Sequence, residues 1–240
     1  MKIMSKTPLL ILRLEGPLQA WGIRARWDVR DSADEPTKSG LIGLLGCALG
    51  YKREDPRLVE LDRQLTLGIR VEHHGIPMTD FHTITGILPT AAGGLKGRED
   101  DPSTIISPRT YLQDAAFLAV FGGSAKILEQ SARALQNPKW PLYLGRKSCL
   151  PTRPIFEELT DRYDSILELM HCYLWDWDGK VTIKKLPSYL RCTTEDLKGE
   201  SLRSDRIRVN PARIYANRRV SVQWVKFPGV KEESRCTFLV

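Results

Sequence analysis

Short apolar runs and helical repeats alternate in a fixed order along the first 150 residues of this 240-residue chain. The run at 9–14 is too short for a helix and is typical of a buried strand. Apolar residues at 41–49 recur at helical spacing, with Thr37 or Ser39 as a natural N-cap and Gly50 at the end. The remaining pattern predicts strands at 65–71, 76–83, 111–121 and 142–144, and a helix around 127–135 capped by Ser124.

This order of strand, helix, strand, insertion, strand, helix and strand predicts an α+β domain of the ferredoxin-like (RRM-like) type. We expect such a domain to leave one face of an antiparallel sheet open, as RNA-recognition domains do for unstacked bases. Enzymes and metal carriers share the same order, so the fold alone does not assign a function.

The insertion at about 87–107 has no periodicity, and such a segment inside a compact domain is expected to be functional or mobile. Residues 151–240 have a different character. Tyr173, Trp175 and Trp177 alternate before a hairpin turn at Asp178-Gly179, and alternation returns near 220–224. We therefore predict a domain at 1–150 and a small β-rich domain at 151–240. Six arginines and one acid, Asp205, lie between 202 and 219.

The charge is +7, from 36 basic and 29 acidic residues. This surplus favours a polyanionic partner, although many unrelated proteins share it. The five cysteines include no C-x-x-C pair, so we expect reduced thiols in a cytoplasmic protein, without a zinc site. No apolar run reaches the length of about 18 residues that a membrane span needs, so no membrane partner is expected.

Three local clusters carry the polar chemistry. The first is the turn at 16–22, where Gln19 is a candidate for hydrogen bonds to a base edge. Trp21 offers a stacking surface worth about 1–3 kcal/mol per base. The alternative is that Trp21 anchors the core and Gln19 caps a loop.

The second cluster is the helix start at 37–43, where Lys38, Ser39 and Gly40 place a cation, a hydroxyl and free backbone N–H groups at the positive end of a helix. It lacks the spacing of a Walker P-loop. The alternative is a plain N-cap, with glycine for tight packing.

The third cluster is the segment 141–149, where Arg146, Lys147 and Ser148 follow Tyr143 and a glycine. It combines phosphate-binding groups with an aromatic surface. The alternative is a solvated pair of charges at the end of a strand.

Together these clusters resemble the type I-E CasD family, the Cas5 branch of the RAMP superfamily of RNA-binding proteins. The resemblance spans residues 9–151. It is carried by the turn G-P-x-Q-A-W-G at 16–22, the helix start T-x-S-G-L-x-G-L-L-G at 37–46, Asp80-Phe81-His82-Thr83, Arg109-x-Tyr111-Leu112-x-Asp114-Ala115-x-Phe117 and Tyr143-Leu144-Gly145-Arg146.

The resemblance implies a ferredoxin-like domain with a long inserted β-hairpin thumb, at the place of residues 87–107. It also implies a non-catalytic subunit of a hetero-oligomeric Cascade complex, which grips the 5′ handle of the crRNA and contacts the CasA-type large subunit and a CasC-type backbone subunit. The RNA-binding residues that we expect are Gln19, Trp21, Arg24, Arg26, Lys38, Ser39, Gly40, His82, Arg109, Tyr143, Arg146, Lys147 and Ser148.

Type I-C relatives cleave RNA, so a metal-independent endoribonuclease that processes precursor crRNA is the alternative. Its general base would come from His73, His74, His82 or His171. We expect no catalytic residue, no cofactor and no metal site, because no Asp/Glu cluster suggests metal ligands and the adjacent acids at 99–101 and 157–158 are typical of solvated charges.

Overall fold

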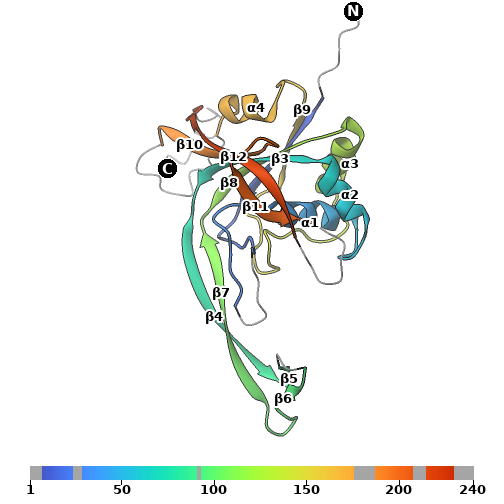
Figure 1. Ribbon diagram of the computed structural model, residues 1–240, viewed down its shortest axis with the longest axis vertical. Coiled ribbons are helices and arrows are strands. Elements are labelled where there is room, and N and C mark those ends of the chain that lie inside the picture. The colour runs from blue at the N-terminus through green and yellow to red at the C-terminus, as the bar shows by residue number, and fades with distance from the viewer. Residues whose placement is uncertain (1–6, 24–28, 91–92, 176–186, 208–214, 230–240) are drawn as a thin grey trace, which may run out of the picture.

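A seven-stranded antiparallel sheet forms the body of the protein, in the strand order β11-β12-β10-β3-β8-β1-β9. The computed structural model describes residues 7–23, 29–90, 93–175, 187–207 and 215–229. The strands of this sheet are β1 (Leu9–Glu15), β3 (Thr66–His73), β8 (Ala116–Gly122), β9 (Phe156–Thr160), β10 (Tyr189–Glu195), β11 (Ser201–Arg206) and β12 (Ala216–Lys226). Figure 1 shows this body with one long hairpin extending from it.

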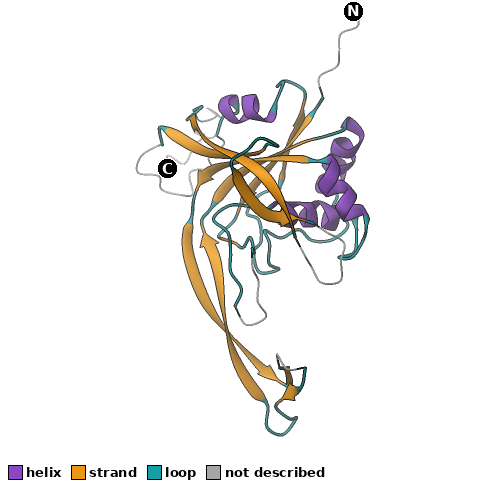
Figure 2. Ribbon diagram, viewed as in Figure 1, coloured by secondary structure: helices purple, strands orange, loops and turns teal. Residues whose placement is uncertain are grey.

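Three helices pack beside one another on the body, as Figure 2 shows: α1 (Lys38–Leu49), α2 (Arg57–Gln64) and α3 (Ala125–Gln136). The helix α1 begins at Thr37, whose hydroxyl accepts a hydrogen bond from the Gly40 N–H at 3.3 Å. It ends at Gly50, where φ is +75° and a side chain would be strained. The predicted helix at 41–49 is therefore confirmed, with Thr37 rather than Ser39 as its cap. None of the described helices has the length and apolar character to cross a bilayer.

The strand β1 is buried on both faces. Leu10, Leu12 and Leu14 pack in the core with α1, α2 and α3. Leu9 and Ile11 pack in a second core with residues of α4 (Ile166–Cys172) and of β10 and β12. The predicted open sheet face is therefore wrong: α4 and its neighbours cover it, because the apolar residues on that face need burial as much as those on the other.

The hairpin, which we call the arm, consists of β4 (Ile76–Gly86) and β7 (Ser103–Gln113), paired along their whole lengths. Two short strands, β5 (Leu88–Pro89) and β6 (Leu95–Lys96), pair near its tip. The predicted aperiodic segment at 87–107 is therefore too long. Residues 103–107 belong to β7, and the tip is 87–102.

Two predicted strands differ in the structure. The single strand expected at 111–121 is divided into β7 and β8, because Asp114 adopts a left-handed conformation with φ of +53°. The strand expected at 142–144 is a loop. Its apolar pattern reflects burial of Leu144 in the core, not pairing in a sheet.

The C-terminal part is rich in strands, as predicted, but these strands continue the body sheet. The strand β10 pairs with β3 through Thr193 and its neighbours, and β9 pairs with β1. The boundary predicted between 150 and 151 therefore does not separate two sheets. The hairpin turn predicted at Asp178-Gly179 lies outside the described residues.

Candidate nucleic-acid interface

The first and third sequence clusters meet at the base of the arm. The Ala20 N–H donates to the Leu144 carbonyl at 3.0 Å. Gly145 lies so close to Ala20 that an added Cβ would come within 1.7 Å of the Ala20 carbonyl oxygen. The second cluster joins them, since Gly40 lies against the ring of Trp21. Glycines in these motifs thus permit three loops to pack together.

Arg146 clamps this junction to the arm. Its guanidinium donates to the carbonyl of Thr110 in β7 at 2.8 Å, and to the carbonyls of Arg30 and Asp31 at 2.8 and 3.1 Å. The same group lies over the ring of Tyr111, 4.5 Å from the ring centroid. Three donors of Arg146 thus bind backbone carbonyls, so this residue joins the loops to the arm, and its phosphate contact stays a prediction.

Trp21 and Gln19 are core residues. The exposed fraction of Trp21 is 1%, and its indole N–H donates to the Gln19 side-chain oxygen at 3.1 Å. The Gln19 amide donates to the carbonyls of Leu14 and Ala115 at 3.0 and 2.7 Å. The predicted stacking by Trp21 and base reading by Gln19 are therefore wrong, and the alternative of a core anchor holds.

The start of α1 already has an anionic partner. The backbone N–H of Lys38 donates to the Asp205 carboxylate at 2.8 Å, and the Lys38 ammonium binds Glu195 at 2.8 Å. A buried carboxylate thus occupies the position predicted for a phosphate, and Lys38 is not available to RNA. Ser39 and Gly40 are half-buried at this end of α1.

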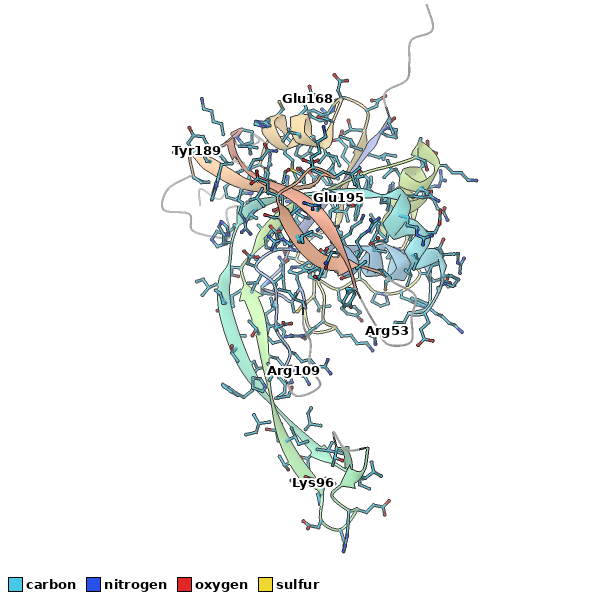
Figure 3. The ribbon with its side chains drawn as sticks, viewed as in Figure 1. Arg53, Lys96, Arg109, Glu168, Tyr189 and Glu195 are labelled. Atoms are coloured by element: carbon cyan, nitrogen blue, oxygen red, sulfur yellow. The ribbon has the colours of Figure 1, made fainter. Side chains whose placement is uncertain are left out.

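Arg109 in β7 has no side-chain partner among the described residues. Its side chain is half-buried, and its Nε is buried without a hydrogen-bond partner among the described residues. An extended segment at Arg30 pairs beside it: the Arg30 N–H donates to the Pro108 carbonyl, and the Thr110 N–H donates to the Arg30 carbonyl, both at 2.9 Å. Figure 3 shows Arg109 on the arm, between the body and the tip.

His82 lies on the same face of the arm as Arg109. In the register of β4 and β7, Asp80 is opposite Arg109 and His82 is opposite Ser107. The Nε2 of His82 contacts the Asp80 carboxylate at 2.6 Å, and both side chains are partly exposed. The partner of His82 was not predicted, although the spacing of the two residues on one strand face was a signal for it.

We call the group of Arg30, His82, Arg109, Lys147 and Ser148 the arm-base surface. Lys147 and Ser148 are exposed and follow the clamp residue Arg146. Tyr143 is half-buried on the same loop. Sequence reasoning missed Arg30, which lies in the same Arg-rich loop as the predicted Arg24 and Arg26. These last two lie outside the described residues.

The arm itself is not basic. Residues 76–113 contain four acids and three Lys or Arg residues, a net charge of −1, while the whole chain carries +7. The rest of the chain therefore carries +8, and any phosphate contacts should come from the body and the arm base. Among the described residues, no group of three His, Cys, Asp or Glu side chains is placed to hold a metal ion.

Comparison with known proteins gives related matches over most of the chain. Residues 9–221 match the model of the family described as CRISPR-associated protein (Cas_Cas5). The chain is 35% identical over 159 residues to the CRISPR system Cascade subunit CasD of Escherichia coli (strain K12), which is 61% of this chain and 69% of that protein. A solved structure titled "CRISPR RNA-guided surveillance complex" contains a chain with a TM-score of 0.73 and 30% identity, covering 92% of this chain and 91% of that one. Another, titled "Crystal structure of Cas protein", has a TM-score of 0.67 and 32% identity, covering 91% and 95%.

Proposed function

The chain belongs to the Cas5 family of CRISPR-associated proteins, and we propose that it is a non-catalytic, RNA-binding subunit of a Cascade-type surveillance complex. In this role it grips the 5′ handle of the crRNA in antiviral defence in the cytoplasm. It joins a CasA-type large subunit to a CasC-type backbone subunit at the foot of the complex. The likeness to a Cascade subunit and to a chain of an RNA-guided complex supports this role.

Two parts of the fold receive an assignment under this proposal. The order β1-α1-β3-β8-α3-β9, with the strands arranged β3-β8-β1-β9, corresponds to a ferredoxin-like unit to which β10, β12 and β11 are added at one edge. The arm, inserted between β3 and β8, corresponds to the thumb. It extends from the body in Figure 1, where it can contact a partner without disturbing the core.

The observation that carries the proposal is the Arg109 side chain, which has no carboxylate partner among the described residues and whose Nε is buried without an acceptor. Four other described arginines have such an Nε, but each of them also binds a carboxylate. A buried donor without an acceptor costs about 1–3 kcal/mol, so a partner from outside the chain is favoured for Arg109. A phosphate fits, because it accepts charge-assisted hydrogen bonds from a guanidinium. Lys147 and Ser148 on the neighbouring loop add a cation and a hydroxyl suited to the same RNA backbone.

The test measures the affinity of the purified chain for its repeat-derived handle RNA at several salt concentrations. We expect the logarithm of the affinity to fall steeply with the logarithm of the salt concentration. Replacing Arg109 and Lys147 together by alanine should weaken binding and flatten this slope. An unchanged slope in the double variant would mean that these side chains do not contact the phosphates.

A separate experiment tests the absence of catalysis. The protein is incubated with the full repeat RNA, once with EDTA and once with magnesium, and we expect the RNA to remain intact. Discrete cleavage that disappears in a His82→Ala variant would instead assign a ribonuclease activity to the arm-base surface.

A further inference from the structure

The segment 139–147 connects the end of α1 with the arm base. At one end, the Lys139 N–H donates to the Ala48 carbonyl at 2.9 Å, and the Lys139 side chain packs against Gly50. At the other end, Arg146 donates to Thr110 in β7. The segment therefore runs along the body from the end of α1 to the arm. Figure 3 shows Arg53, which follows α1, on the same lower side of the body as Arg109.

Unpaired cations lie at the α1 end of this path. The side chains of Lys52, Arg53 and Lys139 are exposed, and none of them has a hydrogen-bond or ion-pair partner among the described residues. Of the two acids beside them, Asp55 is already bound to Arg57 by hydrogen bonds of 2.6–3.2 Å. The surface at this end is thus positive, with Glu54 as its unpaired acid in the described part of the chain.

An exposed aromatic residue directly follows Lys139 in the sequence. Trp140 is 39% exposed, although most large apolar residues of the body are buried. Its backbone carbonyl and that of Pro141 lie near the Cys47 thiol on α1. One turn from Cys47 on the same helix, a side chain added at Gly43 would meet no atom within 4 Å, so the surface of α1 is open at this position.

We propose that Lys52, Arg53, Lys139 and Trp140 form a second RNA-contacting site, the α1-end site, and that single-stranded RNA leaving the arm base follows segment 139–147 to reach it. A base stacks on Trp140, and the three cations contact the flanking phosphates. The inference rests on the proposed function, because it extends the RNA path beyond the arm-base surface. A protein partner would suit an aromatic surface too, but three cations without side-chain partners at this end of α1 favour a polyanion.

The test compares two single-stranded RNAs that share the handle sequence, one of about 8 and one of about 16 nucleotides, within the range of single-strand site sizes. We expect Trp140→Ala to weaken binding of the longer RNA at least about fivefold, the lower limit for loss of one stacked base. Affinity for the shorter RNA should not change. Trp140→Phe should retain most of the affinity, because the smaller ring still stacks.

The three cations are tested by the dependence of affinity on salt concentration. Replacing Lys52, Arg53 and Lys139 by glutamine should reduce the slope of log affinity against log salt for the longer RNA by about 2, or about 0.7 per phosphate contact.

The chain supplies its own controls. Trp224 is 63% exposed on β12, and Lys226 lies on the same strand, so Trp224→Ala and Lys226→Gln remove a ring and a charge away from the path. We expect neither change to affect either RNA. The proposal is overturned if the Trp140 and cation variants bind the longer RNA like the unaltered chain, or if both RNAs lose affinity equally.

Retained RNA binding with lost assembly into the complex would assign the surface to a protein partner, which also overturns the proposal. If the unaltered chain bound neither RNA, the proposed function itself would fail, and that outcome differs from all of the others.

Discussion

The arm and the C-terminal strands use their charged residues in opposite ways. In β10, β11 and β12, arginines are paired with acids: Arg191 and Arg203 bind Glu35, Arg206 binds Asp62, and Arg218 binds Asp205. In the arm, the Arg109 side chain has no carboxylate partner among the described residues, and its Nε is buried without an acceptor. The Nε atoms of Arg191 and Arg203 are also buried without an acceptor, but both of these guanidinium groups bind Glu35. The ion pair that the C-terminal arginines have, and that Arg109 lacks, is therefore the difference between the two regions.

The apolar residues differ in how many faces they cover. The C-terminal strands bury Val220, Val225 and Cys192 on one face and expose Trp224, at 63%, on the other. On the arm, Phe81 is 66% exposed and Ile106 is 62% exposed. The C-terminal strands are thus stabilised by packing and ion pairs with the N-terminal half, whereas the arm contributes little to the core and remains available to partners. The comparison shows that a side chain without a partner inside the chain indicates a binding region better than its residue type does.

The strongest test of this contrast removes Asp205. Its carboxylate binds Arg218, which is 6% exposed, and caps the Lys38 N–H at the start of α1. We expect Asp205→Ala to lower the free energy of unfolding by about 3–5 kcal/mol, because it leaves a buried guanidinium unpaired. Denaturant unfolding measures the change.

Asp34→Ala is the matched control: the side chain of Asp34 is 60% exposed in its pair with Arg191, so we expect a loss of about 0–1 kcal/mol. Equal losses in the two variants would contradict the structural role of the buried network.

The second test acts on binding and leaves stability alone. Arg109→Ala should weaken handle affinity by about 1.5–3 kcal/mol, roughly 10- to 150-fold, as expected for hydrogen bonds to a charged group. Arg109→Lys should cost almost as much, since an ammonium lacks the planar fork of donors. Arg219→Lys is the control, because Arg219 is exposed on β12. The melting temperature should stay nearly constant in all three. A large drop in melting temperature for Arg109→Ala would assign Arg109 to the folded structure instead.

The sequence predicted much of the fold because its strands and helices bury regular apolar stripes. It predicted β1, α1, β3 and α3 in their order, and it placed a long insertion between two strands. It missed α4, a helix of 7 residues whose packing closes the second face of the sheet. It also divided the chain at 150, since a change in local pattern does not reveal that β10 pairs with β3.

The site was harder to predict, because residue type does not show where a donor finds its acceptor. The sequence made Lys38 a reasonable phosphate ligand. In the structure, its backbone N–H donates to the carboxylate of Asp205, which lies 167 residues away in the sequence. Trp21 and Gln19 bind one another in the core. The structure brings the three motifs together, and most of their polar groups join loops to one another. Arg109 stood out once the other arginines with a buried, unsatisfied Nε were seen to bind carboxylates.

The third test uses burial within the C-terminal strands. Cys192 in β10 is fully buried, and burial raises its pKa from the ordinary value of 9.0 to about 12. Above pH 9 the unfolded chain releases this proton and the folded chain keeps it. The free energy of unfolding should therefore fall by about 1 kcal/mol between pH 9 and 10 from this group, because half of the unfolded thiols are already ionised at pH 9. Cys192→Ala should remove this part of the slope, whereas Cys172→Ala, at an exposed thiol, should not. A slope that is the same in both variants would contradict the prediction.

The last test changes the arm and should affect stability least. Replacing residues 87–102 by a short Gly-Ser linker keeps the paired strands β4 and β7, and none of the residues described in this tip belongs to either core. The closure entropy of a loop changes slowly with its length, so the free energy of unfolding should change by less than about 1 kcal/mol.

Binding of the handle RNA at the arm base should persist, but assembly with the partner subunits should fail if the arm is the thumb. Reconstitution of the complex with guide RNA, followed by size-exclusion chromatography, measures this. A variant that unfolds would show that the tip stabilises the body, and one that assembles fully would show that the partners bind the chain elsewhere.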